Sequence, residues 1–284
     1  MNKINLYLEL AKPRILSMVL VTTTLGFFLG NRGLHPVGVF LATLLGIGSS
    51  TGGAAMLNNY IDRNSDANMN RTRGRALPSG LIEPHHALTA GVGLVLIGVL
   101  ELLYAVNLLT AFLVLLAAFL YVMVYTPMKK VTWLNTTIGA IPGAIPPIAG
   151  WAAATGRVDP GAWALFAVLF AWQHPHFFAI AWMYRDDYRA AGFKMLPVVE
   201  PTGERTFHQT IAFSILLIGV SMLPTALGIA GRFYLWGTLI IGLGMLSVAL
   251  DFARYHGIGD ARRLLKASVL YLPMLLLLIV LDAT

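Results

Sequence analysis

Three polar side chains stand at helical spacing near the end of an apolar stretch: Asn58, Asp62 and Asp66. A continuing helix would place all three on one face. Their oxygens are hard donors that suit Mg²⁺, which is typically held by one or two carboxylates together with substrate phosphates. Ionisable groups near membrane depth are costly and need a reason. We therefore favour a metal site over a salt-bridged helix end.

Three arginines, Arg71, Arg73 and Arg75, follow this cluster within a short segment. A guanidinium group can hold phosphate oxygens through two parallel hydrogen bonds. Carboxylates that suit Mg²⁺, followed by arginines, indicate a site for a metal-bound phosphate ligand.

A second acidic cluster, Asp186 and Asp187, lies between Arg185 and Arg189 at the end of a later apolar stretch. Four apolar stretches separate the two clusters, so both are expected on the same side of a membrane. A helix end stabilised by Asp–Arg pairs is the alternative interpretation of this second cluster.

The elements that must position these residues are membrane helices. Of the 284 residues, 57% are apolar and only 12% are charged, whereas about a quarter of the residues of a soluble domain are charged. Lipid must therefore face much of the outside. The absence of cysteine excludes disulfides, thiolate nucleophiles and Cys-bound metals. Residues 1–13 lack the cleavage pattern of a secretory signal.

A helix that crosses a bilayer needs about 20 mostly apolar residues. The chain is predicted to be an all-α membrane protein, one polytopic domain over residues 1–284 with a bundle of about nine transmembrane helices. Asn107 and Thr110 make the only break within 86–127, so the count is weakest there. The predicted spans are 15–31, 36–59, 86–106, 109–127, 134–154, 161–183, 209–229, 233–252 and 265–282.

The basic residues predict the orientation. With the amino terminus in the cytoplasm, all of the 20 lysines and arginines except Arg32, Arg157 and Arg232 fall on the cytoplasmic side. Most of these charges serve as topology signals and lipid headgroup contacts, and their distribution argues against nucleic acid as a partner. Long loops are usually functional, so loops near 60–85, 184–208 and 253–264 predict a polar cytoplasmic cap that carries the active site.

The first cluster and its arginines resemble the first aspartate-rich motif of the intramembrane, UbiA-type prenyltransferase superfamily. The resemblance implies a nine-helix bundle that transfers a prenyl group from a metal-bound diphosphate. It also implies catalytic and binding roles for particular residues. Mg²⁺ would be held by Asn58, Asp62 and Asp66, and the diphosphate would be bound by Arg71, Arg75, Lys129, Arg14 and Lys194.

The superfamily usually carries a second Asp-xxx-Asp motif, and this chain departs from it. Ala190 and Ala191 stand four residues beyond Asp186 and Asp187. A second metal would therefore have fewer carboxylates. We expect Asp187, with a catalytic role, to be its main anchor, and Asp186 to be less important.

Further motifs resemble one branch of the superfamily, the protoheme IX farnesyltransferases, over most of the chain up to about residue 205. They are Lys12-Pro13-Arg14, 125–130, 135–139, 143–147, the Trp-Gln-His-Pro-His-Phe stretch 172–177, Asp187-Tyr188 with Gly192, and Met195-Leu196-Pro197-Val198-Val199. The branch implies farnesyl diphosphate and heme B as substrates, heme O as product, diphosphate release and water addition. It also implies the cytoplasmic (inner) membrane as location, and heme A synthase or a terminal oxidase as candidate assembly partners.

The two histidines of the 172–177 stretch are candidate heme ligands, because imidazole is a common axial ligand of heme iron. His176 is the stronger candidate and His174 the weaker. The alternative, a hydrogen bond to a neighbouring helix, has about equal weight for His176. Aromatic faces stabilise cations, so Tyr125 or Trp172 is expected beside an allylic cation.

Three other functions are compatible with parts of this pattern. Prenyl transfer to a hydroxybenzoate or naphthoate is disfavoured by the incomplete second acidic pair and the 172–177 stretch. A transporter would line a path across the membrane, but the polar clusters lie on one face. A heme electron-transfer protein would leave the acidic clusters unexplained.

Overall fold

The structure is a computed structural model that describes residues 3–283, and within this range helices joined by short turns and loops make up nearly the whole chain. One isolated bridge pairs Ala230 with Ala283. The helices are α1 (Lys3–Leu10), α2 (Pro13–Asn31), α3 (Val37–Asp66), α4 (Pro84–Ala105), α5 (Leu108–Phe119), the π-helix η1 (Leu120–Tyr125), α6 (Thr126–Met128), α7 (Asn135–Thr155), α8 (Pro160–Met183), α9 (Arg185–Ala190), α10 (Leu196–Val199), α11 (Glu204–Ser221), α12 (Leu223–Ala226), α13 (Arg232–Tyr255) and α14 (Ile258–Leu281).

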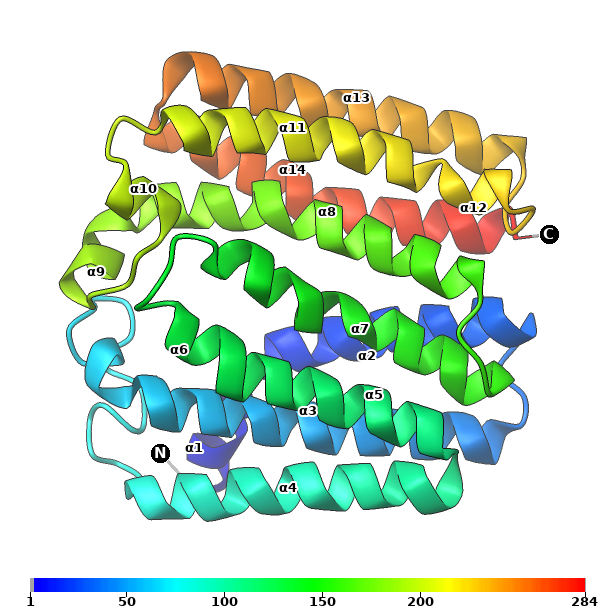
Figure 1. Cartoon of the computed structure of the whole chain (residues 1–284), viewed down its shortest axis with the longest axis horizontal. Coiled ribbons are helices and arrows are strands. Elements are labelled where there is room, and N and C mark those ends of the chain that lie inside the picture. Colours follow the sequence, from blue (N-terminus) through cyan, green and yellow to red (C-terminus); the bar gives the residue numbers. More distant parts are fainter. Residues whose placement is uncertain (1–2, 284) are drawn as a thin grey trace.

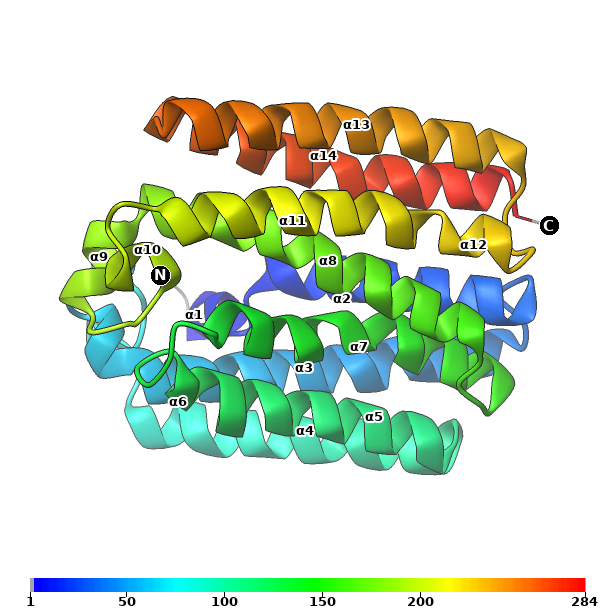
Figure 2. The same cartoon turned by 45° about the horizontal axis from the view of Figure 1, so that its top comes forward.

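The long helices run side by side along one common direction (Figures 1 and 2). The short helices α9 and α10, the end of α3 and the loop 67–83 gather at one end of the bundle (Figure 1). We call this the loop-rich end. The turns from α2 to α3 and from α7 to α8 lie at the opposite end, with α12 and the end of α14.

The predicted membrane architecture is confirmed, with one adjustment to the count. Within the described residues, eight helices are long and apolar enough to cross a bilayer. The predicted break between the third and fourth spans is present, because α4 ends at Ala105 and α5 begins at Leu108. The remaining predicted span, 134–154, forms α7, a helix of 21 residues with three internal prolines that is not among those eight.

The outer surface of the bundle is apolar. Tyr104 of α4, Phe112 of α5 and Trp236 and Ile240 of α13 are all more than half exposed. Large exposed apolar side chains gathered over several helices indicate a surface that contacts lipid rather than water. The protein is therefore a multi-pass membrane protein.

Small residues let α3 and α4 approach closely. A Cβ added at Gly53 of α3 would lie 2.5 Å from the carbonyl oxygen of Gly91 and 2.8 Å from the backbone nitrogen of Val95. Between membrane helices, packing replaces the hydrophobic effect as the driving force, so close backbone contacts matter. The long helix that carries Asn58, Asp62 and Asp66 is held in this way.

We expect Gly53→Ala to destabilise the protein by about 1–3 kcal/mol, the usual cost of overpacking. The backbone atoms of α4 cannot move aside without displacing the helix. Gly93→Ala is a matched control on α4, because a Cβ at Gly93 meets nothing within 4 Å and alanine is the better helix former. Thermal unfolding in detergent measures both, and equal melting temperatures for the two variants would contradict the packing argument.

Helix irregularities open space beside α3. The π-helix η1 interrupts the fourth span, and Pro127 lies two residues after its end. Pro142, Pro146 and Pro147 lie inside α7, which faces η1. Such interruptions are frequent at functional sites because they free local backbone groups and change the direction of side chains. The candidate site lies among these irregular segments.

Candidate active site

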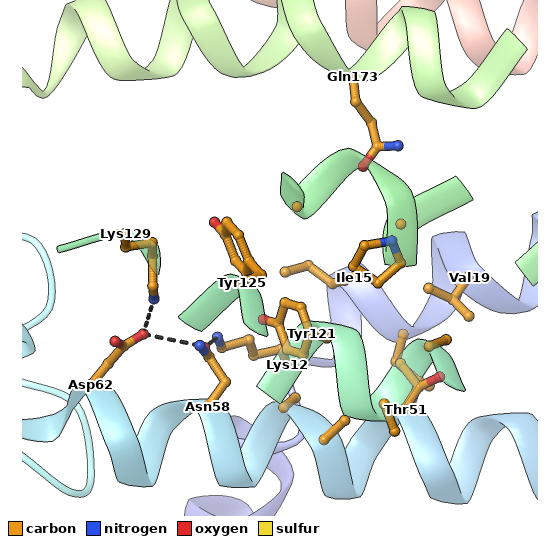
Figure 3. A pocket seen from close by; sticks show the side chains of 18 of the residues that line it. Lys12, Ile15, Val19, Thr51, Asn58, Asp62, Tyr121, Tyr125, Lys129 and Gln173 are labelled. Atoms are coloured by element: carbon orange, nitrogen blue, oxygen red, sulfur yellow. Dashed lines mark hydrogen bonds and ion pairs between the residues drawn. The ribbon is translucent and has the colours of Figure 1, made fainter. Parts of the chain in front are cut away.

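A cavity of about 370 Å³ opens inside the bundle, lined mainly by α2, α3, α5, η1, α7 and α8. Figure 3 shows its polar part, with Lys129, Asp62, Asn58 and Lys12, and the apolar side chains of Ile15 and Val19 beyond it. The polar part lies toward the loop-rich end, where α3 ends. The cavity therefore has a charged part and an apolar part, which suits an amphiphilic substrate.

Asp62 is the centre of the polar part. The Lys129 ammonium contacts Asp62 Oδ2 in a buried ion pair, and Asn58 Nδ2 donates to the same oxygen at 3.0 Å. Lys12 Nζ in turn donates to Asn58 Oδ1 at 2.7 Å. The helical spacing of Asn58 and Asp62 thus places both on the cavity face of α3, as predicted, and brings two lysines from other segments to them.

Asp66 is held one turn further along α3. Arg75 Nη1 donates to Asp66 Oδ2 at 3.0 Å, and the Thr72 hydroxyl donates to the Asp66 carbonyl oxygen at 2.9 Å. Both partners belong to the loop 67–83, which folds back over the end of α3. Arg71 from the same loop donates to the Tyr188 hydroxyl at 2.7 Å and lines the cavity.

Positive charge exceeds negative charge in this cavity. The pKa of Lys12 is lowered to about 7, mainly by burial and in part by the nearby charges of Arg75 and Lys129, against the opposite effect of Asp62 and Asp66. Burial also lowers the pKa of Lys129, although Asp62 opposes the shift. A buried cluster of cations with too few carboxylates favours the entry of an anion.

The carboxylates fit a divalent cation. Asp62 and Asp66 are both buried, line the same cavity and have cations as their ionic partners. Two hard carboxylates, with remaining coordination positions left for substrate phosphates, are the donor set that Mg²⁺ prefers. Asn58 is less available than predicted, because its oxygen already accepts from Lys12.

Two tyrosine rings border the cavity next to the polar part. Tyr121 and Tyr125 of η1 stack with ring centroids 5.6 Å apart, and Figure 3 places both between the charged residues and Ile15. Tyr125 approaches α7 at a glycine, since a Cβ at Gly139 would lie 2.6 Å from its ring. The π-faces of these rings lie where a cation could form next to a bound diphosphate.

The apolar part of the cavity extends between the same helices. Its walls carry small and branched side chains without charge, which leave room for a hydrocarbon chain. They include Ile15, Val19, Ile47, Val114, Ala118 and Ala149.

Some predicted binding residues lie elsewhere. Asp187 Oδ1 accepts from the backbone nitrogen and the side chain of Asn70, at 3.3 and 3.4 Å, so it braces the loop 67–83. Asp187, Arg14 and Lys194 do not line the cavity, and Arg14 and Lys194 are exposed to the outside. The metal role of Asp187 and the diphosphate roles of Arg14 and Lys194 remain predictions.

The two histidines of α8 also face away from the cavity. His174 is within hydrogen-bond distance of the Thr137 hydroxyl (3.1 Å) and stacks on Phe213. His176 lies 2.8 Å from the Ser268 hydroxyl of α14 and stacks on Trp172. Neither histidine nor Trp172 lines the cavity. Their contacts are those of the alternative interpretation, and heme ligation by either histidine remains a prediction.

The cavity residues that the sequence analysis does not assign to the site include Lys12, Tyr121 and Tyr188. The sequence could have indicated Lys12 as a site residue, because it is a basic residue followed by proline immediately before the first span. Tyr188 follows the second acidic cluster directly. Nothing in the sequence indicated Tyr121, since a tyrosine inside an apolar stretch is common.

The sequence is similar to known proteins along almost its whole length. The profile described as "UbiA prenyltransferase family" matches residues 19–277. The protoheme IX farnesyltransferase of Solibacter usitatus is 44% identical over 97% of this chain and 98% of its own length. The enzyme of the same name from Salinibacter ruber is also 44% identical, with the same coverage.

Two solved structures have the same fold. A structure described as digeranylgeranylglyceryl phosphate synthase superposes with a TM-score of 0.83 at 18% identity and covers 99% of both chains. A UbiA homologue from Archaeoglobus fulgidus, bound to DMAPP and Mg²⁺, superposes with a TM-score of 0.67 at 17% identity over 96% of this chain and 98% of its own. At these identities the likeness concerns the fold.

Proposed function

This chain belongs to the UbiA prenyltransferase family, and from that premise we propose that it transfers the farnesyl group of farnesyl diphosphate to a vinyl group of heme B to give heme O. The choice of a prenyl diphosphate as donor is supported by the cavity, in which buried carboxylates and cations adjoin an apolar space. The acceptor half is supported by relatives named protoheme IX farnesyltransferase that match along almost their whole length.

The donor binds with its diphosphate in the polar part and its hydrocarbon chain in the apolar part of the cavity. Lys129, Arg71 and Arg75 line the polar part and donate to the phosphate oxygens. Asp62 and Asp66 would hold Mg²⁺, which as a Lewis acid neutralises charge on the departing diphosphate. Cations preorganised around a leaving group commonly supply the largest part of catalysis.

Transfer begins when the C–O bond of the donor breaks and its electron pair leaves with the diphosphate. The resulting allylic cation lies beside the faces of Tyr121 and Tyr125. A vinyl carbon of heme B attacks the cation, and water then adds to the adjacent carbon with loss of a proton, which gives a hydroxyethylfarnesyl group. The walls of the bundle exclude bulk water from the cation until carbon has attacked.

Replacing Tyr125 tests the role of its ring. We expect Tyr125→Leu to lower kcat about 10–30-fold, the effect of a desolvated cation–π contact, and Tyr125→Phe to retain most activity because it keeps the π-face. Tyr104→Leu is the matched control, since Tyr104 is 84% exposed on the outside of α4. Turnover at saturating donor is the measurement, and a Tyr125→Leu variant with the kcat of the unaltered protein would rule the ring out.

The function itself is tested with purified protein, heme B, farnesyl diphosphate and Mg²⁺, followed by measurement of product mass. We expect heme O, and no product when chelator removes the metal. Turnover of a phenolic acid such as 4-hydroxybenzoate, with no farnesylated heme, would overturn the choice of acceptor and leave the donor half in place. Heme A synthase and terminal oxidases remain candidate partners on the same proposal.

We further propose that the loop-rich end faces the cytoplasm in the cytoplasmic membrane, because the basic residues gather there. The chain has no cysteine, so single cysteines report the orientation. Ser79 and Arg157 are exposed at opposite ends of the bundle. We expect a membrane-impermeant maleimide to label Ser79→Cys in inverted vesicles and Arg157→Cys in right-side-out vesicles. The reverse pattern would contradict this orientation.

A further inference from the structure

Lys12 occupies an unusual position in the backbone. It links α1 to α2 with φ 53° and ψ 65°, in the left-handed region that residues other than glycine rarely adopt because of the Cβ. The conformation is fixed locally, since the Lys12 carbonyl accepts from Ile15 and Leu16 and Asn59 Nδ2 donates to the Leu10 carbonyl. Backbone strain of this kind persists where the side chain is needed in one direction.

That direction is the cavity. The Lys12 side chain reaches into the polar part, as Figure 3 shows, and its ammonium donates to the neutral oxygen of Asn58 at 2.7 Å. Within residues 3–283, Lys12 forms no ion pair with a carboxylate, whereas Lys129 pairs with Asp62 and Arg75 with Asp66. An ammonium group has three donors, so Lys12 retains donors for an anionic ligand in the cavity.

The charges of the cavity can be compared with those of a donor. Among the described residues that line it, four cations (Lys12, Lys129, Arg71 and Arg75) face two carboxylates (Asp62 and Asp66). A diphosphate ester carries roughly three negative charges near neutral pH. One Mg²⁺ with the ester leaves the site close to neutral, with a small positive excess. A second Mg²⁺ would add two more positive charges without a further carboxylate.

The acidic pair Asp186 and Asp187 does not line the cavity, so it cannot supply that carboxylate without rearrangement. Asp186 pairs with Arg189 at 2.7 Å and its side chain is 82% exposed. Asp187 accepts from Asn70 outside the cavity. The described residues that line the cavity therefore offer two carboxylates among four cations, a set that suits one Mg²⁺ rather than two.

We propose that Lys12 is a further diphosphate-binding residue of the donor site, and that with Lys12 and Lys129 in place the site takes a single Mg²⁺. The inference rests on the proposed donor and deepens it, and it does not depend on heme as the acceptor. Lys12 reaches the phosphate oxygens from the α1–α2 link, on the side of Asn58 away from Asp62.

The metal count is tested on the full-length protein with Mn²⁺ as the probe. Mn²⁺ is titrated in the presence of a thiolo analogue of farnesyl diphosphate that does not ionise, and free Mn²⁺ is followed by electron paramagnetic resonance. We expect one bound Mn²⁺ per chain. Two bound ions per chain at saturating analogue would overturn the single-metal site.

The role of Lys12 is tested by the Kd of the same analogue at saturating Mn²⁺. We expect Lys12→Met to raise the Kd about tenfold or more, the effect of losing a hydrogen bond to a charged group, and Lys12→Arg to stay within about threefold. Lys130→Met is the matched control, because Lys130 is exposed and does not line the cavity.

A second variant guards against misfolding. Lys12→Gly suits the left-handed backbone and removes the same ammonium, so it should raise the Kd as Lys12→Met does. An unchanged Kd in a folded Lys12→Gly or Lys12→Met variant would overturn the assignment. No acceptor is present in these measurements. A protein that binds the analogue with one Mn²⁺ but makes no heme O would therefore contradict the proposed acceptor and leave this inference intact.

Discussion

Asp62→Asn is expected to lower kcat for farnesyl transfer by about a thousandfold, the largest effect of any single substitution in this site. Asp62 is one of two buried carboxylates in the cavity and also the partner of Lys129 and Asn58. The amide keeps the size of the side chain and removes the charge that a divalent cation requires. The metal and the orientation of Lys129 are therefore lost together.

Two measurements check this expectation: turnover with saturating donor, and Mn²⁺ binding by the variant. Both should fall. The melting temperature is measured alongside, because the substitution leaves the buried Lys129 ammonium without its ionic partner. Asp251→Asn is the matched control, since Asp251 is exposed on α13 and lies outside the cavity. An Asp62→Asn variant with full activity would remove Asp62 from the metal site.

Lys129→Met is expected to have the second largest effect, a fall in kcat/KM of about 100–1,000-fold. Lys129 is buried at the polar part of the cavity, where its ammonium can stabilise the departing diphosphate. Methionine keeps the unbranched shape of the side chain and removes the ammonium that lies over the Phe193 ring. The loss should therefore report the charge rather than the packing.

Mn²⁺ binding distinguishes Lys129→Met from Asp62→Asn. Lys129→Met frees Asp62 from its ion pair, so Mn²⁺ binding should be retained or strengthened while transfer is lost. The exposed neighbour Lys130→Met should behave as the unaltered protein does. Loss of Mn²⁺ binding in Lys129→Met would mean that the lysine organises the carboxylates and has no direct role toward the diphosphate.

The donor half of the site was largely predictable because its signals are local. Asn58, Asp62 and Asp66 share one helical face by their spacing alone, and the arginines that follow are close in the chain. The family resemblance added Lys129. Lys12 was missed as a site residue, because the direction of its side chain depends on the left-handed link between α1 and α2 and on how α1 is held against α3.

The prediction of heme ligands in α8 depended on how this helix is rotated about its axis, which no local pattern determines. Successive residues of an α-helix point about 100° apart. In α8, Gln173 and Phe177 therefore face the cavity, whereas His174 packs against Phe213 and His176 against Ser268. A shift of one residue in the packing of α8 would bring one of the two histidines to the cavity face.

Sequence by itself determined the helical membrane class, the face on which positive charge gathers and the spacing of Asp62 and Asp66. These properties follow from the transfer of apolar residues into lipid and from the period of the helix, which act between neighbours in the chain. Tertiary structure decided which cations meet those carboxylates and that Asp187 braces Asn70. Such contacts join segments up to 117 residues apart, and only the packing of whole helices brings them together.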